Sequence, residues 1–323
     1  MILDVTDSVQ KTIDSIPPTY KESVIIRVPA GVYRERVEIK HNNVMLIGDE
    51  NGETVITNEH YANEDLPDGT KRGTFRSYTM YIEGSGVTLK NITVRNTAKP
   101  RRIVKQAVAL YAAGDNFLAE NCRFYGYQDT LFTGPLPEKE LVQNGFEGPG
   151  LNKERLQTTQ FYKNCYICGD IDFIFGSASA FFYKCDIEVT CSETGTADKD
   201  GAVCYGYITA ASTYRDREYG YVFKECRIYG DLPERSVYLG RPWREYAKTV
   251  FINCDMSSVV KEEGFHDWNK KEARDTVFYG EYGSKGPGAS GRRASFVKQL
   301  TKEEIGKFDL ETFEEWKELL NHE

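Results

Sequence analysis

Two carboxylates, two amides and a guanidinium occur in stretches of this sequence that otherwise resemble buried strands. Gln106 opens an apolar run, and Gln128 and Asp129 follow Tyr-Gly-Tyr. Asp172 directly precedes Phe-Ile-Phe, and Arg241 lies in Leu-Gly-Arg-Pro-Trp. A carboxylate in an apolar setting needs a charged partner or has a raised pKa. Together these residues predict a polar site, although any one of them alone is equally compatible with capping a turn or satisfying the interior of a coil.

Other catalytic classes lack their residues in this chain. The four histidines, at positions 41, 60, 266 and 322, are scattered. The absence of G-x-S-x-G, P-loop and G-x-G-x-x-G motifs argues against a Ser-His-Asp hydrolase and against a nucleotide-binding protein. The C-x-x-C at 165–168 has no second pair and no nearby histidine, so it does not predict a zinc site. We expect no metal and no cofactor.

An internal repeat indicates the elements that position these residues. An aromatic residue, two others, Cys, one other and an apolar residue recur at 162–167, 182–187, 223–228 and 251–256, with looser copies at 89–94 and 118–124. The cysteines of the repeat lie 43, 20, 41 and 28 residues apart, and we interpret the steps of 43 and 41 as two units of about 20–22 residues. Apolar residues alternate within each unit, as they do in strands. The repeat predicts an all-β parallel β-helix, with a β-sandwich as the alternative.

A parallel β-helix would give the candidate carboxylates and the cysteines defined positions in the solenoid. Asp129 and Asp172 are 43 residues apart and would lie two units apart on the same side of the solenoid. Five of the eight cysteines occupy equivalent places, which favours a stack of reduced core side chains over disulfides.

Both ends of the chain predict short helical caps. Helical spacing at 7–16 ends at a Pro-Pro pair, and Thr301 begins a capping box. The C-terminal helical stretch contains four apolar residues, Ile305, Phe313, Trp316 and Leu320. We expect these helices to cover the two open ends of the stack. Residues 135–158 and 284–294 are predicted loops, and residues 1–323 are expected to form a single domain.

The composition of the chain limits the kinds of molecule that it could bind. The net charge of −8 and the isoelectric point near 5.3 argue against nucleic acid. No apolar stretch is long enough for a membrane span, and the N-terminus has no signal-peptide pattern. We therefore expect no binding to membranes, and we also expect a monomer. It would be cytoplasmic if Met1 is the native start, and secreted if a signal was removed.

Five short motifs stand out along the chain: residues 31–35 (Gly-Val-Tyr-Arg-Glu), 106–110 (Gln-Ala-Val-Ala-Leu), 125–131 (Tyr-Gly-Tyr-Gln-Asp-Thr-Leu), 172–178 (Asp-Phe-Ile-Phe-Gly-Ser-Ala) and 239–243 (Leu-Gly-Arg-Pro-Trp). They resemble motifs of the pectin methylesterase family, in the family's order and at compatible spacings. Residues 278–289 are also similar to the family's C-terminal segment, so the resemblance covers roughly residues 8–300. It implies a right-handed parallel β-helix.

The resemblance also implies a role for each polar residue. Asp172 would be the nucleophile that attacks a galacturonate methyl ester, and Asp129 the general acid and then the general base. Gln106 and Gln128 would donate hydrogen bonds to the oxyanion, and Arg241 would pair with Asp172 and keep it ionised.

The same resemblance implies a cleft lined by aromatic rings. The candidate substrate-binding residues are Thr74, Phe75, Tyr127, Phe132, Phe175, Trp243 and Trp268. Three positions depart from the family's usual residues: Ser177 stands where Asn is usual, Phe132 where Tyr is usual, and Phe265 in a stretch that commonly has a second Trp. These departures bear on the cleft and not on the acid, the nucleophile or the arginine.

We expect the substrate to be methyl-esterified homogalacturonan or its oligosaccharides. Two alternatives remain: another pectin-active β-helix enzyme, such as a polygalacturonase or a lyase, and a non-catalytic carbohydrate-binding β-helix. A polygalacturonase would use the same two carboxylates on a glycosidic bond. A lyase would need an acidic calcium cluster, and no such cluster is found around these motifs.

Overall fold

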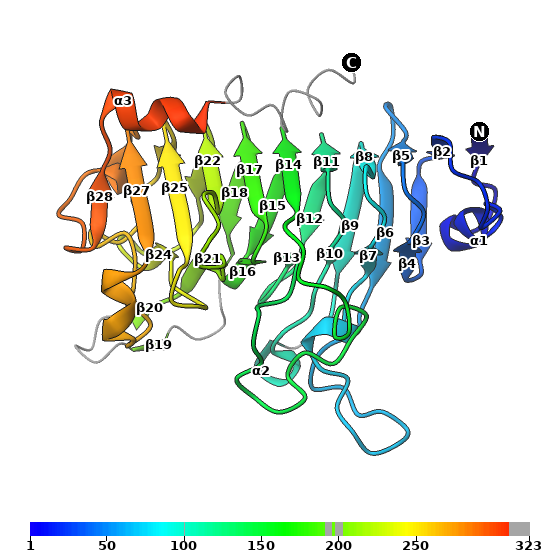
Figure 1. The fold of residues 1–323 in the computed structure, drawn as a ribbon, viewed down its shortest axis with the longest axis horizontal. Coiled ribbons are helices and arrows are strands. Elements are labelled where there is room, and N and C mark those ends of the chain that lie inside the picture. Colours follow the sequence, from blue (N-terminus) through cyan, green and yellow to red (C-terminus); the bar gives the residue numbers. More distant parts are fainter. Residues whose placement is uncertain (100, 191–195, 198–202, 310–323) are drawn as a thin grey trace.

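Three parallel sheets run along the molecule and together form a parallel β-helix, as the repeat predicts (Figure 1). The computed structural model describes residues 1–99, 101–190, 196–197 and 203–309. The eleven-stranded sheet contains β1 (Ile2–Asp4), β2 (Val24–Val28), β5 (Val44–Gly48), β8 (Thr88–Lys90), β11 (Phe117–Glu120), β14 (Thr159–Lys163), β17 (Ser179–Tyr183), β22 (Tyr221–Lys224), β25 (Lys248–Ile252), β27 (Phe278–Tyr282) and β28 (Val297–Gln299).

Two further parallel sheets complete each turn of the solenoid. The eight-stranded sheet contains β3 (Gly31–Arg34), β6 (Thr54–Asn58), β9 (Ile92–Asn96), β12 (Arg123–Tyr125), β15 (Tyr166–Gly169), β18 (Asp186–Val189), β23 (Arg227–Tyr229) and β26 (Asp255–Met256). The seven-stranded sheet contains β4 (Val37–Ile39), β7 (Met80–Ile82), β10 (Leu110–Ala112), β13 (Leu131–Thr133), β16 (Ile171–Gly176), β21 (Gly206–Ala211) and β24 (Val237–Gly240).

Short elements lie outside these sheets. They are the antiparallel pair β19 (Thr196–Ala197) and β20 (Val203–Cys204), the helices α1 (Val9–Asp14), α2 (Arg101–Val104) and α3 (Lys302–Ile305), and the 3₁₀ turns η1 (Thr74–Arg76), η2 (Lys271–Asp275), η3 (Pro287–Ala289) and η4 (Gly306–Phe308). No helix in the described ranges combines the length and the apolar character that a membrane span requires.

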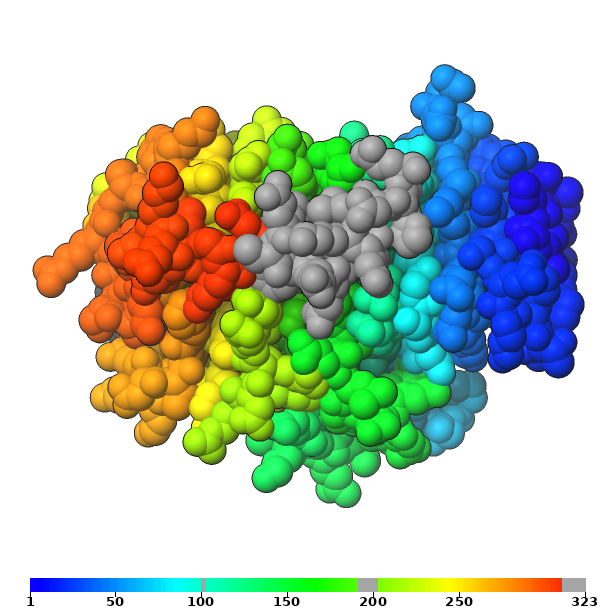
Figure 2. All heavy atoms as spheres, turned by 45° about the horizontal axis from the view of Figure 1, so that its top comes forward, coloured from blue at the N-terminus to red at the C-terminus, as the bar shows by residue number. Residues whose placement is uncertain are grey.

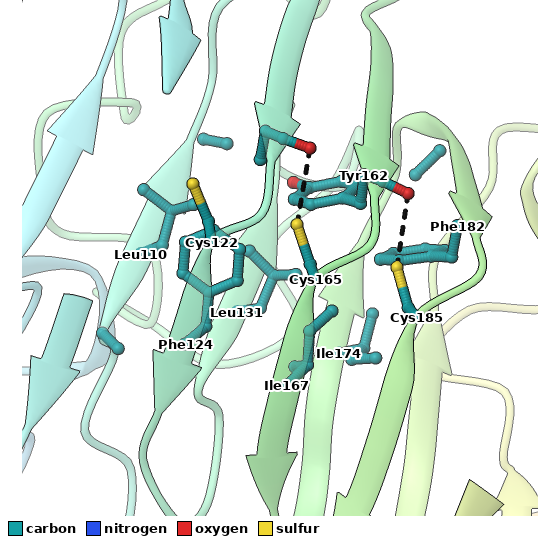
Figure 3. Close-up of a cluster of buried hydrophobic side chains, with 14 of the residues drawn as sticks. Leu110, Cys122, Phe124, Leu131, Tyr162, Cys165, Ile167, Ile174, Phe182 and Cys185 are labelled. Atoms are coloured by element: carbon teal, nitrogen blue, oxygen red, sulfur yellow. Dashed lines mark hydrogen bonds between the residues drawn. The ribbon is translucent and has the colours of Figure 1, made fainter. Parts of the chain in front are cut away.

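The repeated Cys-x-apolar pattern forms a ladder inside the solenoid (Figure 3). The Cys165 thiol donates to the Ala119 carbonyl at 3.4 Å, and the Cys185 thiol donates to the Tyr162 carbonyl at 3.3 Å. Next to the sulfur atoms, the rings of Tyr162 and Phe182 stack with centroids 4.7 Å apart. All seven cysteines in the described residues are free and buried, and the predicted stack is confirmed for Cys122, Cys165, Cys185, Cys226 and Cys254; Cys191 lies outside these residues.

The interpretation of the 43-residue step as two units was wrong. Strand β12 pairs directly with β15, and β13 with β16, so Cys122 and Cys165 lie on neighbouring turns. The 41-residue step between Cys185 and Cys226 is likewise a single turn, because β18 pairs with β23. Insertions between the strands lengthen these turns without adding a rung. One such insertion is the predicted loop at 135–158, and it separates β13 from β14.

The two ends of the chain are covered differently. Helix α1 is capped by Ser8, whose hydroxyl accepts from the Lys11 N–H, and it buries Val9 and Ile13 against the end of the stack as predicted. The predicted capping box at Thr301 is also present.

The described part of the segment that follows Thr301, residues 302–309, does not cover the C-terminal open end. It lies across the outer side of the eleven-stranded sheet (Figure 2), where Ile305 and Phe308 pack with outward-facing Val222 and Val250. The Lys224 ammonium contacts the Asp309 carboxylate at 2.6 Å. Outward-facing apolar side chains on β22 and β25 explain this position, because they gain from being covered. The predicted helical positions Phe313, Trp316 and Leu320 lie outside the described residues.

Candidate active site

Adjacent strands of the seven-stranded sheet bring the predicted polar residues together. Asp172 lies on β16, and Asp129 lies two residues before β13. The register pairs Leu131 with Ile174, so the two aspartates occupy equivalent places on neighbouring rungs. The Asp129 N–H donates to the Ile171 carbonyl at 3.1 Å, which fixes this alignment.

Both aspartates have an unusual backbone conformation. The φ angles of Asp129 and Asp172 are 66° and 52°, in the left-handed region that non-glycine residues seldom adopt. Such residues cost about 1–3 kcal/mol each and cluster at functional sites. Thirteen other non-glycine residues in the described part of the chain share this conformation, so it is a recurring feature of the turns and is not confined to the two carboxylates.

Asp172 and Arg241 form a bidentate ion pair. Arg241 follows β24, and its Nε and one terminal nitrogen donate to the two Asp172 oxygens at 2.8 and 2.7 Å. The guanidinium lies between the rings of Tyr207 and Trp268, at 3.9 and 3.8 Å from their centroids. Burial alone would lower the pKa of Arg241, but the charge of Asp172 and its hydrogen bonds outweigh burial and raise it. Arg241 thus keeps its full charge and orients both oxygens of Asp172.

Asp129 has the opposite environment. Its side chain is buried, and burial followed by the nearby charge of Asp172 raises its pKa well above the usual value. Arg241 opposes this effect but does not cancel it. One carboxyl group with a raised pKa beside one held by an arginine is the arrangement that general acid catalysis with a carboxylate nucleophile requires.

The raised pKa of Asp129 predicts a pH dependence of stability. The folded state holds this proton more tightly than the unfolded chain, so the stabilisation is complete below the unfolded pKa and is lost as pH rises through the folded pKa. Over that interval the loss is about 1.4 kcal/mol per pH unit. We expect Asp129→Asn to remove this component, because an amide does not ionise. The free energy of unfolding, measured with denaturant between pH 4 and pH 8, should fall less steeply with pH in this variant than in the wild type. Identical slopes of stability against pH in the two proteins would contradict the raised pKa of Asp129.

The carboxylates lie at the base of a cleft with a volume of about 480 Å³. Seven of the predicted site residues line it besides Asp129, Asp172 and Arg241: Thr74, Phe75, Gln106, Gln128, Phe175, Trp243 and Trp268. Within the described part of the chain, the side-chain amides of Gln106 and Gln128 have no hydrogen-bond partner, so both are available as donors. The same part of the chain holds no group of three or more His, Cys, Asp or Glu side chains placed to bind a metal ion.

Two predicted binding residues do not line the cleft. Phe132 is completely buried, with its ring 4.9 Å from the rings of both Phe75 and Phe175. The register places Phe132 beside Phe175, but Phe75 covers it, so it supports the cleft from below. Tyr127 is half-buried and lies outside the cleft lining.

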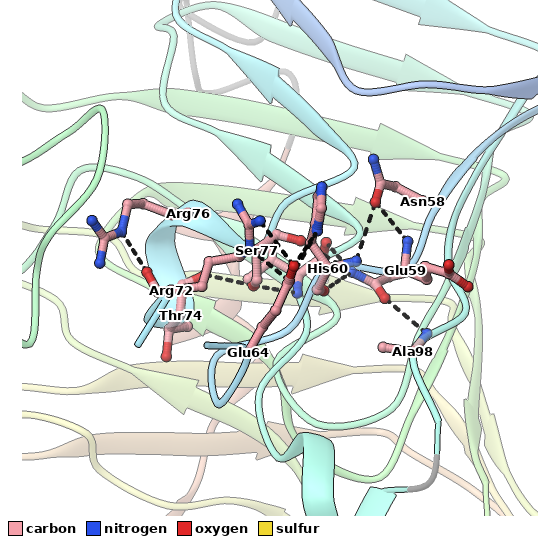
Figure 4. A network of polar contacts seen from close by, with 11 residues as sticks. Asn58, Glu59, His60, Glu64, Arg72, Thr74, Arg76, Ser77 and Ala98 are labelled. Atoms are coloured by element: carbon pink, nitrogen blue, oxygen red, sulfur yellow. Dashed lines mark hydrogen bonds and ion pairs between the residues drawn. The ribbon is translucent and has the colours of Figure 1, made fainter. Parts of the chain in front are cut away.

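A polar network holds the segment that carries Thr74 and Phe75 (Figure 4). Two nitrogens of Arg72 donate to the Glu64 carboxylate at 2.7 and 3.0 Å, and the Nδ1 atom of His60 lies 2.9 Å from it. The hydrogen bond from Arg72 is the main cause that lowers the pKa of Glu64, to about 2. Arg76 in η1 then donates from its side chain to the Arg72 carbonyl. This chain of contacts fixes η1 at the edge of the cleft.

Sequence reasoning missed several lining residues. The inserted loop contributes Glu140, Leu141, Val142 and Phe146, and the Phe146 ring lies 6.3 Å from that of Trp243. Its only sequence signal was an aromatic residue and a Leu-Val pair within a polar segment. Two cations, Arg244 and Lys270, also line the cleft. Their positions, one residue after Trp243 and two after Trp268, would have indicated them.

Comparison with known proteins agrees with the family resemblance of the five motifs. The Pectinesterase family model matches residues 4–136 and 155–315. The probable pectinesterase/pectinesterase inhibitor 64 of Arabidopsis thaliana is 34% identical over 330 residues, which cover 96% of this chain and 49% of that protein. Pectinesterase 3 of Citrus sinensis is 34% identical over 295 residues, which cover 88% of this chain and 44% of that protein. The chain thus spans about half the length of these relatives.

Solved structures match over nearly the full chain. The pectin methylesterase from carrot is 30% identical with a TM-score of 0.76, and the match covers 97% of this chain and 92% of that one. A pectin methylesterase in complex with a hexasaccharide is 25% identical with a TM-score of 0.76, covering 100% and 97%. The family match leaves out residues 137–154, most of the inserted loop, so this wall of the cleft belongs to the part of the chain that the family pattern does not describe.

Proposed function

The chain belongs to the pectinesterase family, and from that premise we propose that it hydrolyses the methyl esters of galacturonate units in pectin or its oligomers and releases methanol. The observation that carries the proposal is the pairing of two unlike carboxyl groups. Arg241 holds Asp172 through both oxygens, while burial raises the pKa of Asp129 beside it. An aromatic cleft of suitable size for a sugar chain opens directly above them.

The first half of the reaction forms an acyl-enzyme. The Asp172 carboxylate attacks the ester carbonyl carbon and produces a tetrahedral intermediate. The amides of Gln106 and Gln128 donate hydrogen bonds to its oxyanion. Asp129 gives its proton to the departing methoxy oxygen, so methanol leaves and an anhydride links the galacturonyl group to Asp172.

The second half restores the enzyme. Asp129, now a carboxylate, takes a proton from a water molecule that attacks the anhydride at the galacturonyl carbon. The bond to Asp172 breaks, the free galacturonate is released, and Asp129 is again protonated. Throughout, Arg241 keeps Asp172 oriented, and the rings of Phe175 and Trp243 contact the sugar chain.

Product analysis tests this proposal directly. Purified protein is incubated with highly methyl-esterified homogalacturonan, and methanol, reducing ends and unsaturated uronate products are measured in the same reaction. We expect methanol without new reducing ends and without unsaturated products. New reducing ends would indicate a polygalacturonase, and unsaturated products a lyase. Binding without any product would indicate a non-catalytic carbohydrate-binding protein.

A further inference from the structure

Trp268 has an unusual backbone conformation beside the Asp172–Arg241 ion pair. Its φ angle is 54°, in the left-handed region. Most of the non-glycine residues with this conformation in the described part of the chain are asparagines, and Trp268 is the only aromatic one among them. A large side chain is rarely found with a positive φ, so specific contacts must hold it there. The Trp268 ring covers one face of the Arg241 guanidinium at 3.8 Å, and its backbone conformation therefore decides where that ring lies.

The contact that holds the Trp268 backbone comes from His266. The Trp268 N–H donates to the Nδ1 atom of His266 at 2.9 Å. Asparagine and aspartate side chains commonly accept the N–H two residues further along in the same way. Asp267 does so for the Asn269 N–H at 2.8 Å. Two overlapping turns of this kind thus carry the chain through Trp268 and Asn269, both of which have a positive φ.

His266 is itself fixed on the seven-stranded sheet. Its N–H donates to the Gly240 carbonyl at 3.0 Å, one residue before Arg241. Its imidazole packs against the rings of Tyr238 and Tyr207, with centroids 5.1 and 5.9 Å away. The Tyr207 ring in turn contacts the Arg241 guanidinium at 3.9 Å. The imidazole therefore contacts one of the two rings that enclose Arg241 and holds the other through its backbone.

Only a neutral imidazole can accept this hydrogen bond. Protonation places a hydrogen on Nδ1, and the acceptor then becomes a donor that faces the Trp268 N–H. Histidine is the side chain whose charge ordinarily changes between pH 5 and pH 8. The hydrogen bond from Trp268 to His266 is therefore sensitive to pH in that range.

The surroundings of His266 bear on the same step. The titratable and charged side chains around His266 and the two tyrosine rings, within the described residues, are Cys204, Tyr207, Tyr238, Arg241, Lys261 and Asp267. Asp267 is bound to Arg274 at 2.6 Å, so its charge is already balanced. The cations Arg241 and Lys261 would repel an imidazolium. Protonation of His266 thus removes the acceptor for Trp268 and adds repulsion beside Arg241.

We propose that the neutral His266 is a positioning residue for the esterase reaction, because its Nδ1 atom holds Trp268 over Arg241 and so keeps the guanidinium aligned with Asp172. The inference rests on the proposed function and adds a pH-sensitive contact to it. Protonation of His266 frees the Trp268 backbone, and the ring then no longer encloses Arg241. The bidentate contact to Asp172 loses one of the two walls that orient it, so catalysis weakens as His266 becomes charged.

Kinetics of three variants test the positioning role. His266→Leu removes the acceptor, whereas His266→Asn keeps an oxygen that accepts the same N–H and does not ionise. At pH 7.5 we expect His266→Leu to lower kcat for methanol release by about fivefold or more, with a smaller change in KM. His266→Asn should stay within about twofold of the wild type. His41→Asn, which lies just beyond β4 at the N-terminal end of the seven-stranded sheet, is the control and should match the wild type.

The pH profile distinguishes positioning from a merely structural role. Between pH 7.5 and pH 5, kcat of the wild type should fall about fivefold more than kcat of His266→Asn, because only the wild type loses the acceptor. Equal pH profiles in these two proteins would overturn the proposal and leave the esterase function intact. Wild-type kcat in His266→Leu, or equal losses in His266→Leu and His266→Asn, would overturn it as well.

A measurement without substrate separates the inference from the reaction. The chain has three tryptophans, so protein labelled with ¹⁵N only at tryptophan gives three backbone amide signals in an NMR spectrum. Trp268→Phe identifies the signal of Trp268. We expect this signal to shift between pH 5 and pH 8 in the wild type and to stay constant in His266→Asn. If the wild type releases no methanol, this difference still supports the role of His266, and its absence overturns it.

Discussion

Replacing Asp172 by asparagine is expected to lower kcat for methanol release by about 10⁴-fold or more, the size of effect seen when a catalytic nucleophile is removed. The exchange preserves the shape of the side chain and removes the negative charge that the proposed mechanism uses to attack the ester. Asparagine also tolerates the left-handed backbone found at position 172, so the strand should keep its register. We therefore expect a circular dichroism spectrum like that of the wild type.

A second aspartate–arginine pair in the same molecule provides the control for Asp172→Asn. Asp186 binds Arg227 through both oxygens at 2.9 and 3.1 Å, but this pair is exposed on the eight-stranded sheet. Exposed pairs contribute about 0–1 kcal/mol to stability, so Asp186→Asn should leave activity and folding near those of the wild type. Wild-type methanol release by Asp172→Asn would rule out Asp172 as the nucleophile.

The second large effect is expected for Arg241→Lys, which should lower kcat by about 10²-fold or more even though the charge is retained. Arg241 holds both Asp172 oxygens through a planar fork, and its flat face lies between the rings of Tyr207 and Trp268. A lysine ammonium is a compact charge that cannot make the same bidentate contact or fill the same slot between two rings. Loss of one preorganised contact in an active site typically costs about 10²–10³-fold in kcat.

Arg227→Lys is the matched control for Arg241→Lys, because Arg227 makes the same bidentate contact with Asp186 outside the cleft. We expect this control to retain wild-type kcat and KM. The positioning role of Arg241 predicts that kcat falls more than KM changes, which steady-state kinetics on one esterified oligomer will resolve. A rise in KM at unchanged kcat would instead assign Arg241 to substrate binding alone.

Much of this architecture was predictable because the signals are local. The alternation of apolar residues and the recurring Cys-x-apolar pattern depend on which face of a strand each side chain occupies, and that is set by neighbours in sequence. The capping residues Ser8 and Thr301 likewise act within a single turn of helix. The resemblance of five short motifs then identified Asp129, Asp172 and Arg241, which the structure brings together.

The remaining features depend on how insertions and side chains meet in space. The number of turns between Asp129 and Asp172 could not be counted from sequence, because an insertion and an extra rung lengthen the chain equally. Ile305 and Phe308 pack on the outer apolar surface of β22 and β25, which exists only once those strands are aligned.

The sequence by itself therefore determined the kind of fold and predicted the candidate catalytic groups, since both depend on local patterns of residue type. Only the tertiary structure decided that Phe132 is buried beneath Phe75, that the inserted loop forms a wall of the cleft, and that the rings of Tyr207 and Trp268 enclose Arg241. These outcomes depend on contacts between segments far apart in the chain, and no local pattern records them. The two aspartates belong to both categories: the chain alone predicted them as site residues, but the raised pKa of Asp129 arises from burial and from the charge of Asp172 that folding places beside it.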